Sequence, residues 1–253
     1  MPPIFLHMAM AADVAGDLPS APLHDEQGTY LFGATTPDIR VITRRDRAET
    51  HYFDLNVFEH QDSVANFFTA HPELRFPEHL SQATVAFVGG YITHLALDET
   101  YIQQVYRPYF GQLSALGGDL SANTMDRILQ YELDRRRRAQ PERVQEIRSA
   151  LENCSFAMDV GFLDSATLRR GREVATDQTR HPPNWERFRF QGTRHLHGLN
   201  VETAEAWERF RGTIPDLLQR TISHVSTAQV DAFLEQATER ARRVLEQYLA
   251  ITA

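Results

Sequence analysis

The chain has 253 residues, of which 42% are hydrophobic and 24% are charged, a balance typical of a globular protein with a packed core in one large or two small domains. A formal net charge of −8 argues against a protein that binds the nucleic-acid backbone through bulk positive charge. The single cysteine, Cys154, excludes an internal disulfide and a cysteine-rich zinc module, so metal ligation would fall to the 11 histidines and the carboxylates.

The chain begins with an apolar segment, "MPPIFLHMAMAADVAGDL", which predicts a helix over residues 4–18. This helix is apolar on most sides and is therefore expected to be buried. No basic residue precedes the apolar run, and His7 and Asp13 interrupt it, so the segment predicts neither a signal peptide nor a transmembrane helix. A cytoplasmic location is the default expectation.

The pattern that follows is helical nearly throughout. Residues 28–58 are predicted to be irregular, with a short helical piece near "TYLFGATTPD". In a long apolar helix over 81–107, Gly89 and Gly90 each cost about 1 kcal/mol relative to alanine, which a closely approaching neighbouring backbone would explain. Further helices are predicted, in chain order, over residues 59–71, 121–139, 141–153, 155–175, 203–222 and 227–250.

The segment pattern predicts the fold class and the domain organisation. Since neither repeats nor β alternation appear, we expect an all-α, multi-helix bundle that forms one domain over residues 1–253. Residues 1–178 would form its core bundle. Residues 179–200 are rich in proline, glycine and aromatic residues and would form an ordered loop. Residues 201–253 would form a C-terminal hairpin of two antiparallel amphipathic helices.

The stretch "GGYITHLALDET" places His94 and Asp98 four residues apart in the apolar helix, so both side chains lie on one face. An unpaired carboxylate in an apolar interior costs several kcal/mol or takes up a proton, and a bound divalent cation removes this cost. From the spacing alone, a buried hydrogen bond between the two side chains is the simpler interpretation. The pair alone therefore leaves both interpretations open.

Three other stretches place a metal-binding side chain in an apolar context. "FLHMA" contains His7, "LFGATTPD" presents Asp38 directly after a proline, and "THYFD" contains His51. Imidazoles and carboxylates from separate segments that converge in a helical core are typical of a site for zinc or another first-row metal. The chain is therefore predicted to hold a metal site.

The order and spacing of these stretches resemble the zinc-dependent phospholipase C family, which shares its helical fold with single-strand-specific zinc nucleases. Short intracellular members begin "MPxxxTH", where this chain has "MPPIFLH", and then show "LGAxxPD", where it has "LFGATTPD". They continue with "THxF" and "GxxxHxxxD", where this chain has "THYFD" and "GGYITHLALD". The resemblance is clear over residues 1–100 and weakens beyond them to a general likeness of helical pattern.

The resemblance implies a ligand set. His51, His94, Asp38 and Asp98 would form one complete site, and His7 would bind a neighbouring ion, with Asp98 bridging the two. In secreted family members the N-terminal amino group also binds the neighbouring ion, so the resemblance allows a backbone ligand from the start of this chain.

The chain departs from the family pattern at the third ion. The family has a histidine in "DxxxHP", where this chain has Ile102, and another in "HxxxE", where it has Ile128 before Glu132. Two of the three ligands for that ion are therefore absent. We expect one or two zinc ions rather than three, with iron or manganese as alternatives.

The predicted function is that of a metal-dependent hydrolase acting on a small-molecule or lipid-like phosphoester. A divalent ion lowers the pKa of bound water to roughly 7 and polarises a phosphoryl oxygen. Asp38 would bind the ion or act as general base. Tyr91, one turn before His94, and Glu132 would contact substrate or support the site.

Two alternatives remain open at this stage. A non-hydrolytic enzyme that uses zinc, iron or manganese for Lewis-acid or redox chemistry would act on a small lipophilic molecule, and a closed apolar pocket would favour it. A helical binding protein would hold a structural ion or none. An open cleft with arginines would instead favour a phosphate substrate. The pair His195 and His197 in "TRHLHGLN" is either a further metal-binding pair or an exposed loop feature.

Overall fold

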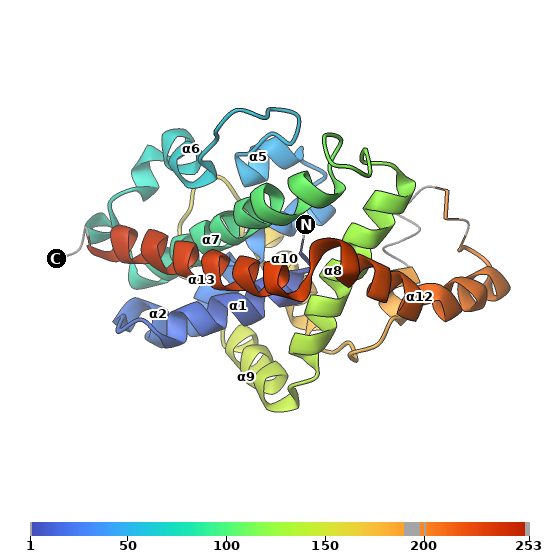
Figure 1. The fold of residues 1–253 in the computed structure, drawn as a ribbon. Helices are drawn as coiled ribbons and strands as arrows, with labels where there is room; N and C mark the ends of the chain where they lie inside the picture. The colour runs from blue at the N-terminus through green and yellow to red at the C-terminus, as the bar shows by residue number, and fades with distance from the viewer. Residues whose placement is uncertain (1, 190–197, 200, 251–253) are drawn as a thin grey trace. The chain divides into compact units, whose positions relative to one another are not determined.

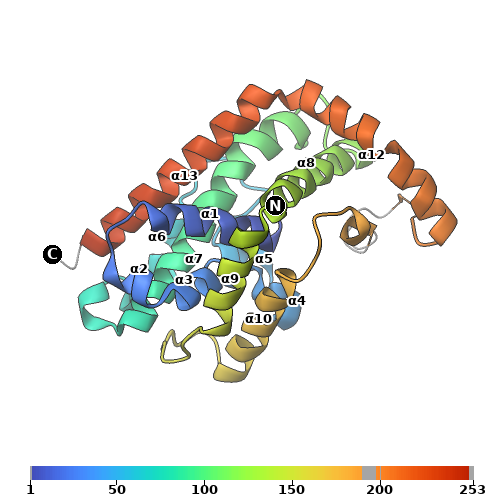
Figure 2. The ribbon, with the colours of Figure 1, turned by 90° about the horizontal axis from the view of Figure 1, so that it is seen from below.

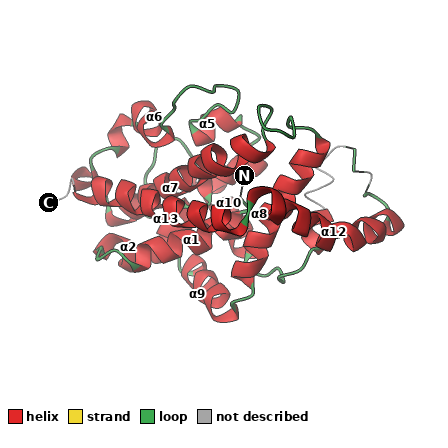
Figure 3. Cartoon of the chain, viewed as in Figure 1, coloured by secondary structure: helices red, strands yellow, loops and turns green. Residues whose placement is uncertain are grey.

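The computed structural model describes residues 2–189, 198–199 and 201–250. Helices joined by loops make up this part of the chain, and no strand occurs within it (Figure 3). This confirms the predicted all-α, multi-helix architecture, whereas the likeness to the phospholipase C fold stays a prediction. None of the helices in the described ranges is both long enough and apolar enough to cross a membrane.

The chain divides into two compact units. The larger unit comprises Ile4–Glu99, Gln140–His181 and Ala237–Ala253, and the smaller unit comprises Met1–Pro3, Thr100–Ala139 and Pro182–Gln236. Because the larger unit is built from three separate stretches, its core depends on contacts between residues far apart in the sequence. The single domain predicted over residues 1–253 stays a prediction.

Among the described residues, the larger unit contains most of the helices; Figure 1 labels the longer ones. In chain order they are α1 (Ile4–Gly16), α2 (Ala21–Asp25), α3 (Gln27–Gly33), η1 (Thr36–Ile39), α4 (Arg40–Thr43), α5 (Arg47–His51), α6 (Ser63–Ala70), η2 (Pro72–Leu74), η3 (Pro77–His79), most of α7 (Gln82–Tyr101), α9 (Pro141–Glu152), α10 (Ser165–Gln178) and the last part of α13 (Thr227–Ala250).

The smaller unit contains η4 (Ile102–Phe110), α8 (Leu120–Arg138), α12 (Ala204–Val225) and the first part of α13. Its apolar core forms where α8 packs against α12, with Ile128, Phe188 and Trp207 buried together. Ser226 alone separates α12 from α13, and its positive φ of 70° ends α12 abruptly. The antiparallel packing predicted for these two helices stays a prediction.

Helix boundaries differ from the sequence predictions mainly where elements are short. Residues 28–58 contain several helices of four to seven residues, too short to show a hydrophobic period. The helix predicted over 155–175 begins only at Ser165, because the Asp164 side chain accepts a hydrogen bond from the Thr167 N–H and caps it there. Within the loop predicted over 179–200, residues 186–189 are helical.

Close packing of α3 against α7 explains two glycines. A Cβ on Gly90 would lie 2.0 Å from the Tyr30 carbonyl oxygen, and one on Gly33 would lie 2.1 Å from the Phe87 carbonyl oxygen. Only glycine permits the two backbones to approach this closely. The predicted close approach at Gly90 is therefore confirmed.

The side chain of Tyr30, in α3, connects the crossing of α3 and α7 to α1. Its hydroxyl lies 3.1 Å from the Ala11 carbonyl oxygen in α1 and 3.2 Å from the Thr93 hydroxyl in α7. The helix α7 is buried along its length from Ala83, which accounts for its apolar composition on all sides. On the other side of α3, α9 lies alongside it (Figure 2), and a Cβ on Gly28 would meet the Ala150 carbonyl oxygen at 2.0 Å. These contacts place α1, α3 and α7 side by side.

Candidate metal centre

Five side chains from four helices of the larger unit converge beside the C-terminal half of α7. They fall into two groups, in each of which the potential ligand atoms lie within 4.8 Å of one another. The first group is Asp38, His51 and His94, and the second is His7, His94 and Asp98. These are the five residues that the sequence analysis selected as metal ligands.

The helix α7 contributes His94 and Asp98, and the crossing with α3 orients the imidazole. The Nδ1 atom of His94 lies 2.8 Å from the Ala34 carbonyl oxygen, which can only accept a hydrogen bond. Nδ1 therefore carries the proton, and Nε2 keeps a lone pair that points into the cluster. A backbone carbonyl that holds the second nitrogen in this way is typical of histidines that bind metals.

The helix α5 ends with His51, which is 1% exposed. Its Nδ1 atom lies 3.0 Å from the Thr50 hydroxyl, which leaves Nε2 facing the cluster. The next residue, Tyr52, has a φ of 53°, an uncommon conformation for a large side chain. A hydrogen bond of 2.7 Å between the Tyr52 hydroxyl and His71 holds Tyr52 in place, and with it the end of α5.

The distances in the first group match those expected around one ion. The Nε2 atom of His51 lies 3.4 Å from Nε2 of His94 and 3.6 Å from Oδ1 of Asp38. Two ligand atoms about 2.1 Å from a tetrahedral zinc ion lie roughly 3.4 Å apart. The three donor atoms are therefore placed to bind one small cation together.

In the second group, polar atoms lack partners. The ring of His7 stacks on that of His94, with centroids 3.8 Å apart and an angle of 13° between the planes. Both His7 Nε2 and Asp98 Oδ1 are buried and have no hydrogen-bond partner among the described residues. Burying such atoms unpaired costs free energy, and a cation between them removes that cost. The donor set therefore fits a metal ion.

The electrostatics keep the centre in its metal-binding protonation state. Burial lowers the pKa of His51 to about 4, and burial together with the nearby His94 holds the pKa of His7 well below its usual value. Burial alone would raise the pKa of Asp38, but its close contact with His51 and the neighbouring imidazoles holds that pKa well below its usual range. Neutral imidazoles and an ionised carboxylate are the forms that bind metals.

Arg47, the first residue of α5, is a member of the cluster that the sequence analysis missed. Its Nη2 atom contacts Oδ2 of Asp98, and its Nη1 atom donates to the Phe53 carbonyl oxygen at 3.1 Å. Burial by itself would raise the pKa of Asp98, but the charge of Arg47 is the largest of the influences that outweigh it, and the pKa lies below its usual value. The spacing of Arg47 and His51, four residues apart, was the available signal.

The family resemblance implies that Asp98 bridges the two ions, but the two groups in the structure share a different residue. His94 belongs to both groups, whereas Asp98 belongs to the second and also pairs with Arg47. Metal ligation by the five residues stays a prediction.

The remaining predicted residues lie elsewhere. The Tyr91 hydroxyl donates to the Thr50 carbonyl oxygen at 2.6 Å, so it supports the end of α5, and its contact with substrate stays a prediction. Glu132 lies in the smaller unit, where it is buried and pairs with two arginines of its own helix, α8. His195, His197 and the first residue of the chain lie outside the described residues.

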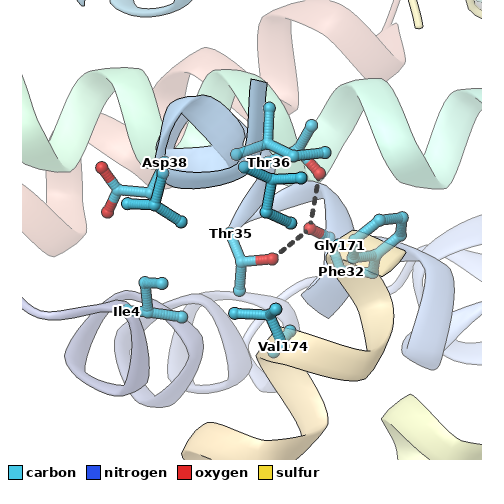
Figure 4. A pocket seen from close by; sticks show the side chains of 11 residues that line it. Ile4, Phe32, Thr35, Thr36, Asp38, Gly171 and Val174 are labelled. Atoms are coloured by element: carbon cyan, nitrogen blue, oxygen red, sulfur yellow. Dashed lines mark hydrogen bonds between the residues drawn. The ribbon is translucent and has the colours of Figure 1, made fainter. Parts of the chain in front are cut away.

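A pocket adjoins the cluster at Asp38 (Figure 4). Its lining is apolar apart from Asp38 and two threonines, whose hydroxyls both donate to the Phe32 carbonyl oxygen, as the dashed lines in the figure mark. The Asp38 side chain is 16% exposed, compared with 1% for His51. The residues that line the pocket are Ile4, Phe32, Thr35, Thr36, Asp38, Ile39, Val41, Ile42, Gly171, Val174 and Ala175.

Comparisons of the chain with protein-family models, with curated proteins and with solved structures found no match.

Proposed function

We propose that this protein is a metal-dependent hydrolase that acts on a phosphoester with a small or lipid-like apolar group. The observation that carries the proposal is the convergence of three potential ligand atoms. His51 Nε2 lies 3.4 Å from His94 Nε2 and 3.6 Å from Asp38 Oδ1. Three such donors leave coordination positions for water and substrate, as in catalytic rather than purely structural metal sites.

The protein's own residues have separable roles in this proposal. A bound divalent ion supplies Lewis acidity, which lowers the pKa of water to roughly 7 and polarises a phosphoryl oxygen. His51 and His94 would hold the ion through their Nε2 atoms. The Thr50 hydroxyl and the Ala34 carbonyl oxygen contact the Nδ1 atoms and orient the two rings. Asp38, which is ionised and partly exposed, binds the ion or accepts a proton from the attacking water.

The pocket beside Asp38 gives the approach to the proposed ion an apolar lining. Its lining side chains are mostly aliphatic, and its two threonine hydroxyls are already bonded to the backbone. The pocket has room for about one water-sized group, so the apolar group of a lipid-like substrate would lie outside it, while the phosphoester reaches the ion from the Asp38 side. The formal net charge of −8 is unfavourable for long anionic polymers and leaves small phosphoesters as the better candidates.

The test combines metal content with turnover. Purified protein is expected to retain about one to two zinc ions per chain by elemental analysis and to hydrolyse p-nitrophenyl phosphodiesters or phosphomonoesters. Both properties should be lost in His94→Ala and retained in His24→Ala, which removes a histidine bonded to the Leu18 carbonyl oxygen and not part of the cluster. Metal binding without hydrolysis of either ester class would contradict the hydrolase.

A second candidate is a non-hydrolytic metal enzyme acting on a small lipophilic molecule. The apolar lining of the pocket favours it, and a set of imidazoles and carboxylates also suits iron and manganese. Elemental analysis separates the two candidates: iron as the bound metal, together with no phosphoester hydrolysis, would replace the hydrolase with this alternative. A protein that holds an ion and shows neither activity would be a binding protein.

A further inference from the structure

We propose that a second pocket of the larger unit, away from the candidate metal centre, binds a small uncharged lipid made of one apolar chain and a hydroxyl group. Residues around the start of α2, residues from η3 to the first turn of α7, and residues near the end of α13 line this pocket, here called the α2–α13 pocket. The inference goes beyond the proposed metal-dependent function and does not rest on it.

The α2–α13 pocket is separate from the metal centre. Val85 lines the pocket from the first turn of α7, whereas His94 lies nine residues further along the same helix. At a rise of 1.5 Å per residue, the two positions are about 14 Å apart along the helix axis. The five candidate metal ligands are absent from the lining of the pocket. A ligand can therefore occupy the pocket without contacting the metal centre.

The size and the lining of the pocket fit an apolar chain. Its volume of about 540 Å³ lies within the roughly 300–1,000 Å³ that is usual for pockets that hold small molecules. Most of its lining side chains are aliphatic or proline, among them Leu18, Leu80, Val85 and Leu249. Contact with these side chains removes the apolar surface of both ligand and protein from water, which is the main favourable term in such binding.

The charge of the lining favours an uncharged ligand. Glu246 is the one charged residue among the described residues that line the pocket, and its Oε1 atom accepts a hydrogen bond of 2.8 Å from Arg242. Because Arg242 already supplies a positive charge to this carboxylate, a cationic ligand is not required. A ligand carboxylate would be repelled by Glu246 and could not donate a hydrogen bond to it.

The polar side chains of the pocket fit a hydroxyl group. Ser20, Gln82 and Glu246 are the polar residues of the described lining. The Ser20 side chain makes no capping hydrogen bond at the start of α2, and Arg242 bonds to Oε1 of Glu246 rather than to Oε2. A hydroxyl donates to a carboxylate oxygen and accepts from a serine hydroxyl or an amide, so its two capacities match these partners.

The test measures lipid binding by displacement of the uncharged fluorescent probe Nile red, whose emission rises in apolar surroundings. Dodecanol and dodecanoate have the same chain length and differ in the head group. Wild type is expected to bind the probe, and dodecanol should displace it at a concentration at least about tenfold lower than dodecanoate, because the carboxylate meets Glu246.

A filling variant locates the binding site. Ala21 lines the pocket and is exposed, so Ala21→Trp places a large side chain in the pocket without disturbing buried residues. It should weaken dodecanol binding at least about tenfold. Ala65→Trp, at an exposed position of α6 outside the pocket, is the matched control and should bind dodecanol as wild type does. Circular dichroism checks that both variants fold.

A pair of charge variants tests the choice of head group. Glu239 and Glu246 both pair with Arg242, at 2.6 and 2.8 Å, and both side chains are 46% exposed, but of the two only Glu246 lines the pocket. Glu246→Gln should reduce the preference for dodecanol over dodecanoate several-fold. Glu239→Gln should leave this preference unchanged.

The outcomes separate this inference from the proposed function. Failure of dodecanol to displace the probe, or equal loss of binding in Ala21→Trp and Ala65→Trp, overturns the lipid site. Equal affinity of wild type for dodecanol and dodecanoate overturns the uncharged ligand class. A wild-type dimer that Ala21→Trp converts into a monomer in size-exclusion chromatography would make the pocket an interface between two copies and overturn the lipid site. Zinc content should equal that of wild type in all four variants, so the metal-dependent function is tested independently.

Discussion

Asp98 and Glu99 are consecutive residues of α7 with the same exposure, 2%. Their carboxylates differ in how many of the two oxygens have a partner. Glu99 Oε2 accepts hydrogen bonds from the Ser63 N–H at 2.9 Å and the Ser63 hydroxyl at 2.6 Å, and Oε1 lies 2.9 Å from Arg240. Asp98 pairs one oxygen with Arg47 and leaves the other without a partner among the described residues.

The difference shows how to distinguish a structural carboxylate from a ligand. A buried carboxylate is compatible with a stable fold when both of its oxygens are paired, as in Glu99. Where one oxygen stays unpaired beside an equally unpaired imidazole nitrogen, as with Asp98 and His7, the missing partner is most simply a cation. Burial alone does not separate the two cases, whereas the hydrogen-bond inventory does.

Matched amide variants test this comparison with the largest expected effect. Asp98→Asn should weaken zinc binding at least about 100-fold, because an amide oxygen replaces an ionised ligand, and loss of supporting groups alone costs 10- to 100-fold. Glu99→Gln should leave zinc affinity unchanged and lower the free energy of unfolding by about 1–3 kcal/mol, since its amide N–H₂ would face the Ser63 donors. Zinc affinity is measured by competition with a chromophoric chelator, and stability by urea unfolding.

Equal loss of zinc affinity in the two variants would contradict the assignment of Asp98 as a ligand and Glu99 as a structural carboxylate. Asp98→Asn with wild-type affinity would assign Asp98 a structural role like that of Glu99.

Acid should destabilise the metal-free protein through the histidines of the centre. His51 has a pKa of about 4 in the folded state and about 6.5 in the unfolded chain, so between these values the unfolded state binds more protons. The free energy of unfolding therefore falls as the pH drops from about 6.5 to about 4, and His51 alone accounts for about 3 kcal/mol of the fall. Urea unfolding at pH 7 and pH 4.5, in the presence of a chelator, measures it.

The variant that isolates this effect is His51→Asn, which cannot take up a proton on unfolding. The difference in stability between the two pH values should shrink in this variant relative to wild type. An unchanged difference would mean that His51 does not stay neutral in the folded protein.

A smaller effect is expected at Tyr91, whose hydroxyl supports the end of α5 through the Thr50 carbonyl oxygen. Tyr91→Phe should cost about 1 kcal/mol of stability and lower zinc affinity several-fold, because His51 is held less firmly. Tyr248→Phe is the control: its hydroxyl donates to the Leu74 carbonyl oxygen at 3.3 Å, away from the cluster. The same affinity in both variants would show that Tyr91 contributes stability and no positioning.

The sequence predicts the long helices well, because each carries enough turns to show an apolar period. The pairing of His94 with Asp98 also follows from sequence, since four residues along a helix return to the same face. The short helices α4 and α5 cannot be predicted from apolar periodicity, because four or five residues are too few to show a period.

Contacts between distant segments lie beyond what periodicity shows. That His7, Asp38 and His51 meet at α7 was expected from the family resemblance and from their apolar surroundings, and the folded chain places them together. Arg47 was missed because "RRDRAETH" looks like a charged surface turn, although its spacing from His51 was visible. Which oxygen of Asp98 is free depends on side-chain geometry that sequence does not contain.

X-ray absorption spectroscopy of the zinc-loaded protein tests most directly whether a cation joins these side chains. The account predicts a first shell of nitrogen and oxygen atoms at about 2.0–2.2 Å, with outer-shell scattering from at least two imidazoles, and its loss in His94→Ala. A spectrum without imidazole scattering, or one that His94→Ala leaves unchanged, would contradict it.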